Sequence, residues 1–409
     1  MQMSRETQMS RETLICSENL AARDTASDLI YLTACSLHGV NPDEKNIKSA
    51  NAEDIYNLAK RHSLSAIVYY ALRETSYFKN AGAELIRQWK EAKEKCVRKN
   101  ILMDVERKQI LDEFEKMHIW YMPLKGIIVK TLYPKDDMRQ MSDNDILYDS
   151  RYRKEVRKLF KERGYAVHSF AGSCHDGYEK KPVYRYEMHN RLFSANRTPK
   201  MESFFKTVEG RLVADENGGY ERRMTNEDFY IYLTAHAYKH YLDSGTGIRT
   251  LTDFYVVNKK YAESLDWNYV FDCLKQLDIF DFEEKCRHLS ERLFGEPLPV
   301  DLMNLPVEEQ EIFSRLYYSG TSGIIENNVQ RSLELVGMDA DSFDKSKRVE
   351  FYFKCLFPGM EWCKRCHPFF YRHPVLIPIL IAYRVIYAVT ADRKKTFQKI
   401  KAVHKMTRA

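Results

Sequence analysis

Hydrophobic residues recur at helical spacing along the first part of the chain. Over residues 27–117 apolar side chains return every three or four positions, and the charge-rich stretch that begins at Ala83 keeps this period. The pattern predicts an all-helical N-terminal domain over residues 21–117. Residues 1–20 are polar and contain two copies of Met-Ser-Arg-Glu-Thr, a composition that is typical of a disordered leader.

The pattern changes at His118, where short apolar runs bounded by turn residues replace the helical period. Strands are expected over residues 118–123, 143–148, 165–170 and 183–193, and helices over 127–132 and 151–163. Gly172 and Gly177 indicate a loop between the last two strands. This order predicts a small mixed sheet with helices on one side, within residues 118–220.

The helical period returns near residue 221. Thr225 begins a capping sequence, and Phe229, Leu233 and Ala237 then follow one helix face. Residues 221–409 are therefore expected to form a C-terminal helical domain with a basic tail. The whole pattern indicates the α+β class, with a small mixed β-sheet core flanked by N-terminal and C-terminal helical domains.

Composition adds two constraints. The 64 basic and 58 acidic residues of the 409 leave a net charge of only +6, which is too small to indicate a general preference for nucleic acid. The nine cysteines follow no regular spacing, and the N-terminus lacks the apolar segment of a secretory signal. A reducing, cytoplasmic location is therefore expected.

Asp143 and Asp145 are the centre of the candidate chemistry. Side chains two positions apart on a strand share one face, so these carboxylates are expected to project side by side. Such a pair is unfavourable unless a cation neutralises it, and Mg²⁺ bound to a triphosphate takes one or two carboxylates together with phosphate oxygens. A D-x-D sequence is nevertheless common by chance, and most examples are surface aspartates.

Other residues extend this candidate site. Lys125-Gly126 follows a predicted strand and opens a helix, where backbone amides and the positive helix end can receive phosphate. Arg139 offers a guanidinium four residues before Asp143. Lys125, Gly126, Arg139 and Ser142 are the candidate nucleotide-binding residues. Glu187, on a later strand, is a candidate third carboxylate, although by itself it is typical of an exposed strand residue.

Several motifs occur in a fixed order along the chain. They are Leu124-Lys125-Gly126, Tyr133-Pro134, Arg139, Asp143-x-Asp145-Ile146-Leu147, Gly164-Tyr165, Glu187-x-His189-x-Arg191-Leu192, Leu233-x-x-His236-x-x-x-His240, Arg249-x-x-x-Asp253, Leu356-Phe357-Pro358, His373-Pro374 and Tyr383-Arg384. Together with the helical segment from Leu58 to Ile67, these motifs resemble the largely uncharacterised nucleotidyltransferase family of bacterial proteins over roughly residues 25–400. That family is a branch of the polymerase-beta-like nucleotidyltransferase superfamily.

The resemblance implies a metal-binding pair at Asp143 and Asp145 and a third acidic residue at Glu187, which helps to activate an acceptor hydroxyl. It implies Mg²⁺, with Mn²⁺ as a substitute, as the cofactor. Lys125-Gly126 stands where other superfamily members have Gly-Ser. Asn144 replaces the usual apolar residue between the aspartates, so the opposite strand face is expected to be less buried. Asn190 stands where an aromatic residue is common.

Two function classes follow from this resemblance. The first is an enzyme that transfers a nucleoside monophosphate from a nucleoside triphosphate to an acceptor, which is a small molecule, a sugar, a protein or an RNA. The second is a non-catalytic nucleotide-binding or regulatory protein that keeps the fold. The intact carboxylates favour the enzyme.

The histidines and Arg249 have plainer interpretations. His236 and His240 have the spacing of helical metal ligands but lack a third ligand, so packing against the nucleotide domain is favoured over structural zinc. His189 is expected to be a packed or capping residue. Arg249 and Asp253 have the spacing of an intrahelical ion pair.

Cys363-x-x-Cys366-His367 spells a haem-attachment pattern. Haem is attached outside the cytoplasm, and an export signal is not evident. The match is therefore attributed to chance, and haem is not an expected partner.

Residues 375–391 form a 17-residue apolar run ahead of the basic tail. The run is at the lower limit for spanning a bilayer, and its central Arg384 costs about 2.5–3.5 kcal/mol on insertion. Pro378 and Arg384 favour a helix packed in the protein core. A weak contact of this tail with a membrane surface is the alternative.

Overall fold

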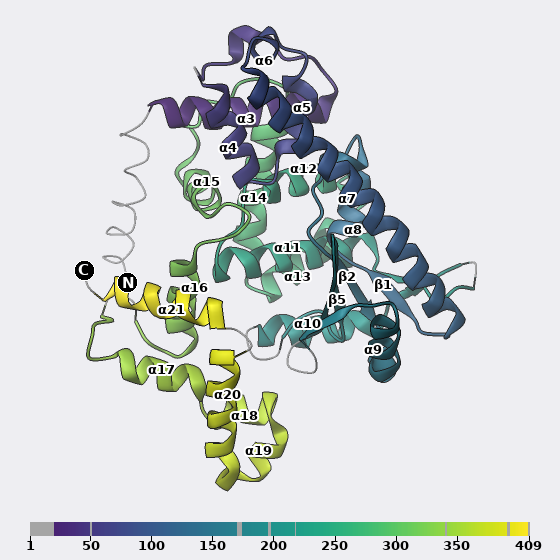
Figure 1. Ribbon diagram of the computed structural model, residues 1–409, viewed down its shortest axis with the longest axis vertical. Coiled ribbons are helices and arrows are strands. Elements are labelled where there is room, and N and C mark those ends of the chain that lie inside the picture. Colours follow the sequence, from purple (N-terminus) through teal and green to yellow (C-terminus); the bar gives the residue numbers. More distant parts are fainter. Residues whose placement is uncertain are drawn as a thin grey trace.

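The computed structural model describes residues 20–49, 51–169, 174–194, 198–216, 218–339, 342–390 and 393–407. Within them, helices surround one small sheet (Figure 1), so the predicted α+β class is confirmed. Residues 1–19 of the predicted leader lie outside the described part, as do Phe170 and Gly172 of the predicted third strand and loop.

Five strands form a mixed sheet in the order β1–β2–β5–β4–β3. They are β1 (Tyr121–Pro123), β2 (Asn144–Tyr148), β3 (Ala166–Ser169), β4 (His175–Lys180) and β5 (Tyr184–His189). β2 and β5 run parallel, whereas the other neighbours are antiparallel. The loop prediction around Gly177 was wrong, because this glycine lies inside β4. A Cβ there would come within 3.0 Å of Ser169 Oγ, so the glycine permits close strand packing.

Helices cover both faces of the sheet, not one face as predicted. α7 (Ala83–Lys116) and α9 (Arg153–Glu162) share a hydrophobic cluster with Ile146, Tyr148, Tyr186 and Met188 on one face. Leu147 points the opposite way and joins a second cluster with residues of α11 (Asn226–Asp243) and α12 (Arg249–Tyr261). The helices on this second face come from a distant part of the sequence, which a local pattern does not reveal.

Asn144 lies on the face that α7 and α9 cover. It is fully buried, and its Oδ1 accepts a hydrogen bond from Arg107 Nη1 at 3.0 Å. The expectation of a less buried face was therefore wrong: the polar side chain lies inside the core, where an arginine from α7 donates a hydrogen bond to its Oδ1.

The second cluster extends through the N-terminal helices and the helices that follow the sheet, so residues far apart in sequence share one core. Short 3-10 turns lie at Glu44–Asn46, Lys130–Leu132, Asp136–Met138, Ser150–Tyr152 and Pro374–Leu376, and β6 (Val213–Ala214) pairs with β7 (Arg222–Arg223). The remaining helices up to residue 319 are α3 (Leu20–His38), α4 (Ala52–Arg61), α5 (Ser65–Leu72), α6 (Ser76–Lys79), α8 (Gly126–Val129), α10 (Pro199–Glu209), α13 (Trp267–Gln276), α14 (Phe280–Phe294) and α15 (Val307–Ser319).

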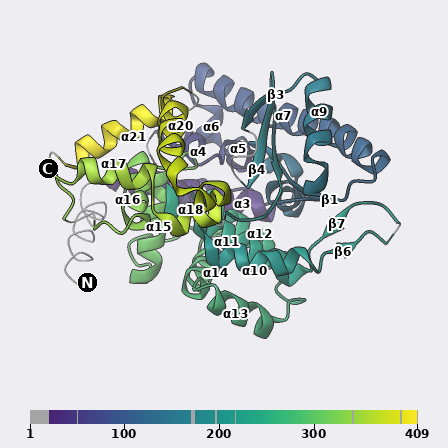
Figure 2. The ribbon, with the colours of Figure 1, turned by 90° about the horizontal axis from the view of Figure 1, so that it is seen from below.

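The C-terminal helices lie at the lower end of the molecule in Figure 1 and face the viewer in Figure 2. They are α16 (Ile325–Leu335), α17 (Arg348–Leu356), α18 (Met360–Cys366), α19 (Pro368–Arg372), α20 (Ile377–Thr390) and α21 (Arg393–Met406). The first of them, α16, contacts α11. α20 occupies the predicted apolar run, but Leu380 is its single buried residue. The prediction of a core helix was therefore wrong. Among the described helices, none combines the length and the apolar character that crossing a membrane requires.

Candidate functional site

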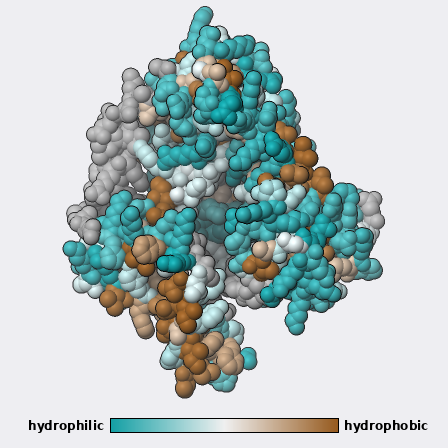
Figure 3. Space-filling view, viewed as in Figure 1, coloured by the Kyte–Doolittle hydropathy of each residue, from teal (hydrophilic) through white to brown (hydrophobic). Residues whose placement is uncertain are grey.

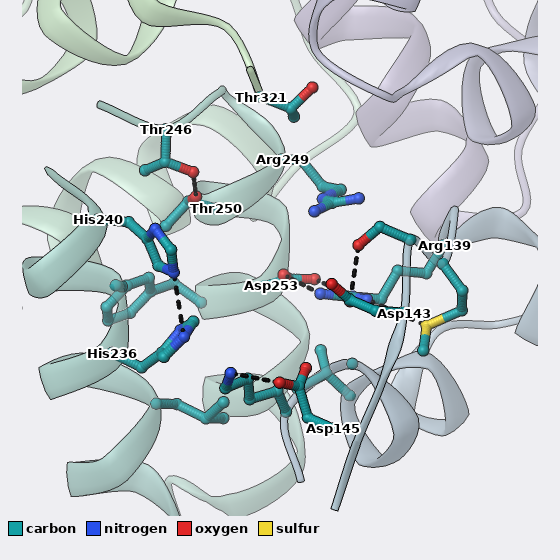
Figure 4. A pocket seen from close by; sticks show the side chains of 18 of the residues that line it. Arg139, Asp143, Asp145, His236, His240, Thr246, Arg249, Thr250, Asp253 and Thr321 are labelled. Atoms are coloured by element: carbon teal, nitrogen blue, oxygen red, sulfur yellow. Dashed lines mark hydrogen bonds and ion pairs between the residues drawn. The ribbon is translucent and has the colours of Figure 1, made fainter. Parts of the chain in front are cut away.

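A pocket of about 640 Å³ lies between the sheet and helices α11 and α12 (Figure 4). All seven residues selected from the sequence line it, although they come from several elements. They are Lys125, Gly126, Arg139, Ser142, Asp143, Asp145 and Glu187. The tertiary fold adds a facing wall of polar side chains: His236, His240, Ser244, Thr246, Arg249, Thr250, Asp253, Thr321 and Ser322.

The parallel pairing of β2 and β5 brings two carboxylates together. Asp145 and Glu187 are directly opposed in the register, so their side chains share one face of the sheet. Ligand atoms of Asp145, Glu187 and His189 all lie within 4.8 Å of one another. This is a spacing that one cation can bridge.

Asp143 lies just before β2, at the rim of the pocket. It is half-buried, and its Oδ1 accepts a hydrogen bond from Ser142 Oγ at 2.8 Å. Asp143 and Asp145 both point toward the cavity in Figure 4, as the two-residue alternation of a strand predicts. Asp143 thus adds a carboxylate at the open end of the site.

Lys125 supplies the positive charge nearest to Asp145. It has φ of +49° at the turn that opens α8, and its Nζ lies 2.6 Å from Asp145 Oδ1. Burial opposes the charged form of the lysine, but Asp145 and Glu187 favour it, and the net result is a raised pKa for Lys125. The strained backbone of Lys125 therefore places its charged ammonium group next to the carboxylates.

The two opposed carboxylates have pKa values that shift in opposite directions. Burial raises the pKa of Asp145, but Lys125 and His189 outweigh burial and hold it well below its ordinary value. Burial and the neighbouring Asp145 charge raise the pKa of Glu187. Of the two carboxylates, Asp145 thus favours the ionised form, and Glu187 more readily holds a proton.

His189 belongs to this site. It is buried, and its Nε2 lies 2.9 Å from Asp145 Oδ1. It does not cap a helix, which was one of the two predicted roles. Cys174, His175 and His189 also bring three ligand atoms within 4.8 Å of one another, on the side of His189 toward β4. The site therefore continues from carboxylates to softer nitrogen and sulfur donors.

Arg139 is held by Asp253, a residue of α12. Its Nε lies 2.8 Å from Asp253 Oδ1 and its Nη2 lies 2.8 Å from Oδ2, so the ion pair is bidentate. The predicted ion pair between Arg249 and Asp253 is not present in the described structure, where Arg249 Nη1 donates to the Gln140 carbonyl at 2.9 Å. Asp253 therefore pairs with Arg139, from the segment before β2, and not with Arg249 of its own helix.

Gly126 permits this arrangement. A Cβ at this position would come 2.5 Å from Arg139 Nη1 and 3.1 Å from Met141 Sδ. Even the methyl group of an alanine would therefore clash with Arg139 in its observed position. Close packing is thus a second reason for glycine here, in addition to its place at the start of the helix.

His236 and His240 form the opposite wall of the pocket. Their Nε2 atoms lie 3.1 Å apart. Burial and nearby lysines lower the pKa of His240 to about 3 and lower that of His236 well below its ordinary value. Both rings are therefore neutral, and the pair offers hydrogen bonds without charge. The i, i+4 spacing identified these residues, but their place in the pocket depended on the fold.

One comparison with known proteins gave a match. A model of a family described as uncharacterised nucleotidyltransferase matches residues 48–295, which is more than half of the chain. Neither the curated proteins nor the solved structures contain a significant match. The matched segment includes the whole sheet, α11 and α12, and it ends before α15.

Proposed function

The chain belongs to this family of uncharacterised nucleotidyltransferases, and on that premise we propose that it transfers a nucleoside monophosphate from a nucleoside triphosphate to an acceptor in a Mg²⁺-dependent reaction. Asp143 and Asp145 would hold the metal, with Mn²⁺ as a substitute. Glu187 would complete the carboxylate triad. Lys125, Gly126 and the nearby pocket wall would receive the triphosphate.

The observation that carries this proposal is the register pair of Asp145 and Glu187. Two carboxylates that share one face of a sheet repel each other, and the pKa of Glu187 is raised first by burial and then by the Asp145 charge. Lys125 and His189 both contact Oδ1 of Asp145, and among the described residues no hydrogen bond reaches Oδ2. A free carboxylate oxygen beside a second carboxylate fits a hard divalent cation.

The proposed reaction follows from these positions. The acceptor oxygen forms a bond to the α-phosphorus, the bond from that phosphorus to the bridging oxygen of the β-phosphate breaks, and pyrophosphate leaves. Glu187, whose pKa is raised, takes the proton of an acceptor hydroxyl. Bound Mg²⁺ would supply charge neutralisation on the phosphates. Lys125 holds Asp145 in place and adds positive charge near the phosphates.

One observation favours a second candidate function. The Lys125 ammonium, 2.6 Å from Asp145, already neutralises a carboxylate of the proposed metal site. A chain that keeps the fold but binds nucleotide without transfer would use this ion pair in place of a metal. The two functions differ in their response to Mg²⁺, because the ion pair holds without it.

The test uses nucleoside triphosphates labelled at the α-phosphate or at the γ-phosphate, each with Mg²⁺ and cell extract. Transfer predicts that an acceptor gains the α-label, that it never gains the γ-label, and that Asp145→Asn abolishes the transfer. Asp272→Asn, which removes an exposed carboxylate of α13, is the matched control and should retain activity. Mg²⁺-independent binding with no labelled product would favour the non-catalytic function.

A further inference from the structure

The outer side of α20 presents a continuous row of apolar side chains to solvent, called here the α20 stripe. The stripe consists of Ile379, Tyr383 and Ile386 of α20 and of Val375 in the 3-10 turn just before it, with exposed fractions of 60%, 61%, 60% and 89%. Ile379, Tyr383 and Ile386 follow one another at intervals of four and three residues and therefore share one face of α20. Figure 3 shows hydrophobic residues gathered over this helix at the lower end of the molecule. Monomeric proteins rarely leave such a row uncovered.

The inner side of α20 fixes this orientation. Leu380 is buried with Trp362 and Cys363, Arg384 Nη2 donates to the Cys355 carbonyl at 3.0 Å, and the Arg384 guanidinium lies 4.5 Å from the Trp362 ring centroid. The polar residue in the middle of the run thus faces the protein, and the large aliphatic residues face outward. Rotation of the helix to bury the stripe would break these contacts.

The surroundings of the α20 stripe are basic. Over residues 364–408 the sequence has eleven lysines and arginines and a single acidic residue, Asp392. Arg372 ends α19 just before the stripe, and Arg393 and Lys394 begin α21 just after α20; all three are exposed. Positive charge therefore lies at both ends of the apolar row.

We propose that the α20 stripe docks this protein on the surface of a membrane rich in anionic phospholipids. The aliphatic and tyrosine side chains would enter the boundary between headgroups and acyl chains, with α20 parallel to the bilayer. Arg372, Arg393 and Lys394 would contact lipid phosphates. This segment lies outside the matched range 48–295, so the proposal does not depend on the proposed reaction.

The same features disfavour other occupants. A symmetric contact with a second copy of this chain would place the basic residues of both copies against each other. Single-stranded nucleic acid is held by basic residues together with aromatic stacking surfaces, whereas the outward residues here are mainly isoleucine and valine. Apolar aliphatic chains beside positive charge match a lipid headgroup layer.

The test is co-sedimentation of the full chain with vesicles of phosphatidylcholine alone or with one quarter phosphatidylglycerol. The expected result is binding to the anionic vesicles, with weaker binding to neutral vesicles and in 0.5 M salt. The double substitution Ile379→Ser, Ile386→Ser should lower the vesicle-bound fraction at least tenfold. Ile101→Ser, Val105→Ser is the matched control, because it removes two similarly exposed residues from α7; it should bind as the parent does.

Three outcomes would overturn the proposal. The first is equal vesicle binding by the stripe variant and the parent. The second is the absence of vesicle binding by a parent chain that is folded, as a cooperative thermal unfolding transition shows. The third concerns light scattering without vesicles: the parent is a dimer, whereas the Ile379→Ser, Ile386→Ser variant is a monomer. The stripe would then be a contact between two copies of the chain. Each changed side chain is largely exposed, so the variants should keep the melting temperature of the parent.

Discussion

Arg139 and Asp253 lie 114 positions apart in the sequence and form a bidentate ion pair between the segment that precedes β2 and helix α12. Burial raises the pKa of Asp253, but Arg139, Arg249 and Tyr133 outweigh burial and lower it. Tyr133 Oη also donates to Asp253 Oδ1 at 2.7 Å. The pair joins the segment before β2 to a helix on the opposite side of the pocket, and both Arg139 and Arg249 line the cavity.

Asp253→Ala should destabilise the protein strongly. The change leaves a largely buried guanidinium without its partner, and removal of one member of a buried pair costs about 3–5 kcal/mol. Urea unfolding measures the loss. Asp112→Ala is the control, because it breaks an exposed ion pair with Lys108 and should cost about 0–1 kcal/mol. Equal losses in the two variants would contradict a structural role for the Arg139–Asp253 pair.

Gly126→Ala tests the packing beneath Arg139. The added methyl group would lie 2.5 Å from Arg139 Nη1, so the arginine must move, at a cost of about 1–3 kcal/mol. A Cβ at Gly82 meets no atom within 4 Å, and Gly82→Ala should therefore stay within about 1 kcal/mol of the parent. Thermal unfolding compares the two variants. A stable Gly126→Ala protein would show that this glycine serves only the helix start.

Glu187→Gln should raise the stability of the protein at pH 7 and lower its transfer activity. Because its pKa is raised above the ordinary 4.5, the folded chain holds the Glu187 proton to higher pH than the unfolded chain does. The stability contributed by this group is therefore full at low pH and is lost as pH rises through the raised pKa. Without Mg²⁺, the glutamine variant should be more stable than the parent at pH 7 and equal to it below the ordinary pKa.

The same Glu187→Gln variant should lose about 10²- to 10⁴-fold in transfer rate, the usual contribution of a general base. Unfolding curves at several pH values and the labelled-nucleotide assay provide the two measurements. Glu263→Gln changes an exposed carboxylate and should alter neither quantity. Full activity in Glu187→Gln would remove Glu187 from the proposed mechanism.

Nucleoside triphosphates should stabilise the fold only together with Mg²⁺ or Mn²⁺. A ligand at a hundred times its Kd adds about 2.7 kcal/mol, which a thermal shift detects for each of the four common triphosphates. The double substitution Asp143→Ala, Asp145→Ala should remove the shift. The same shift in that variant, or in the parent without metal, would exclude these aspartates as the metal site.

The sequence alone was enough to predict how neighbouring residues of the site are arranged. The spacing of Asp143 and Asp145 fixes a shared strand face, and Lys125-Gly126 at the end of a strand indicates a turn into a helix. Both features depend on neighbouring residues alone. Glu187 required the family resemblance, because no local rule states which strand becomes the neighbour of β2.

Long-range pairing was decided by the tertiary structure. Arg249, four residues away on the same helix, was the expected partner of Asp253. In the structure Arg139 forms this ion pair instead, and its bidentate geometry compensates for the desolvation of the two charges. The orientation of α20 was likewise settled by Arg384 and Trp362, which turn its apolar residues outward. A sequence determines which residues share a face of a helix or strand, whereas only the packing of distant elements determines what that face meets.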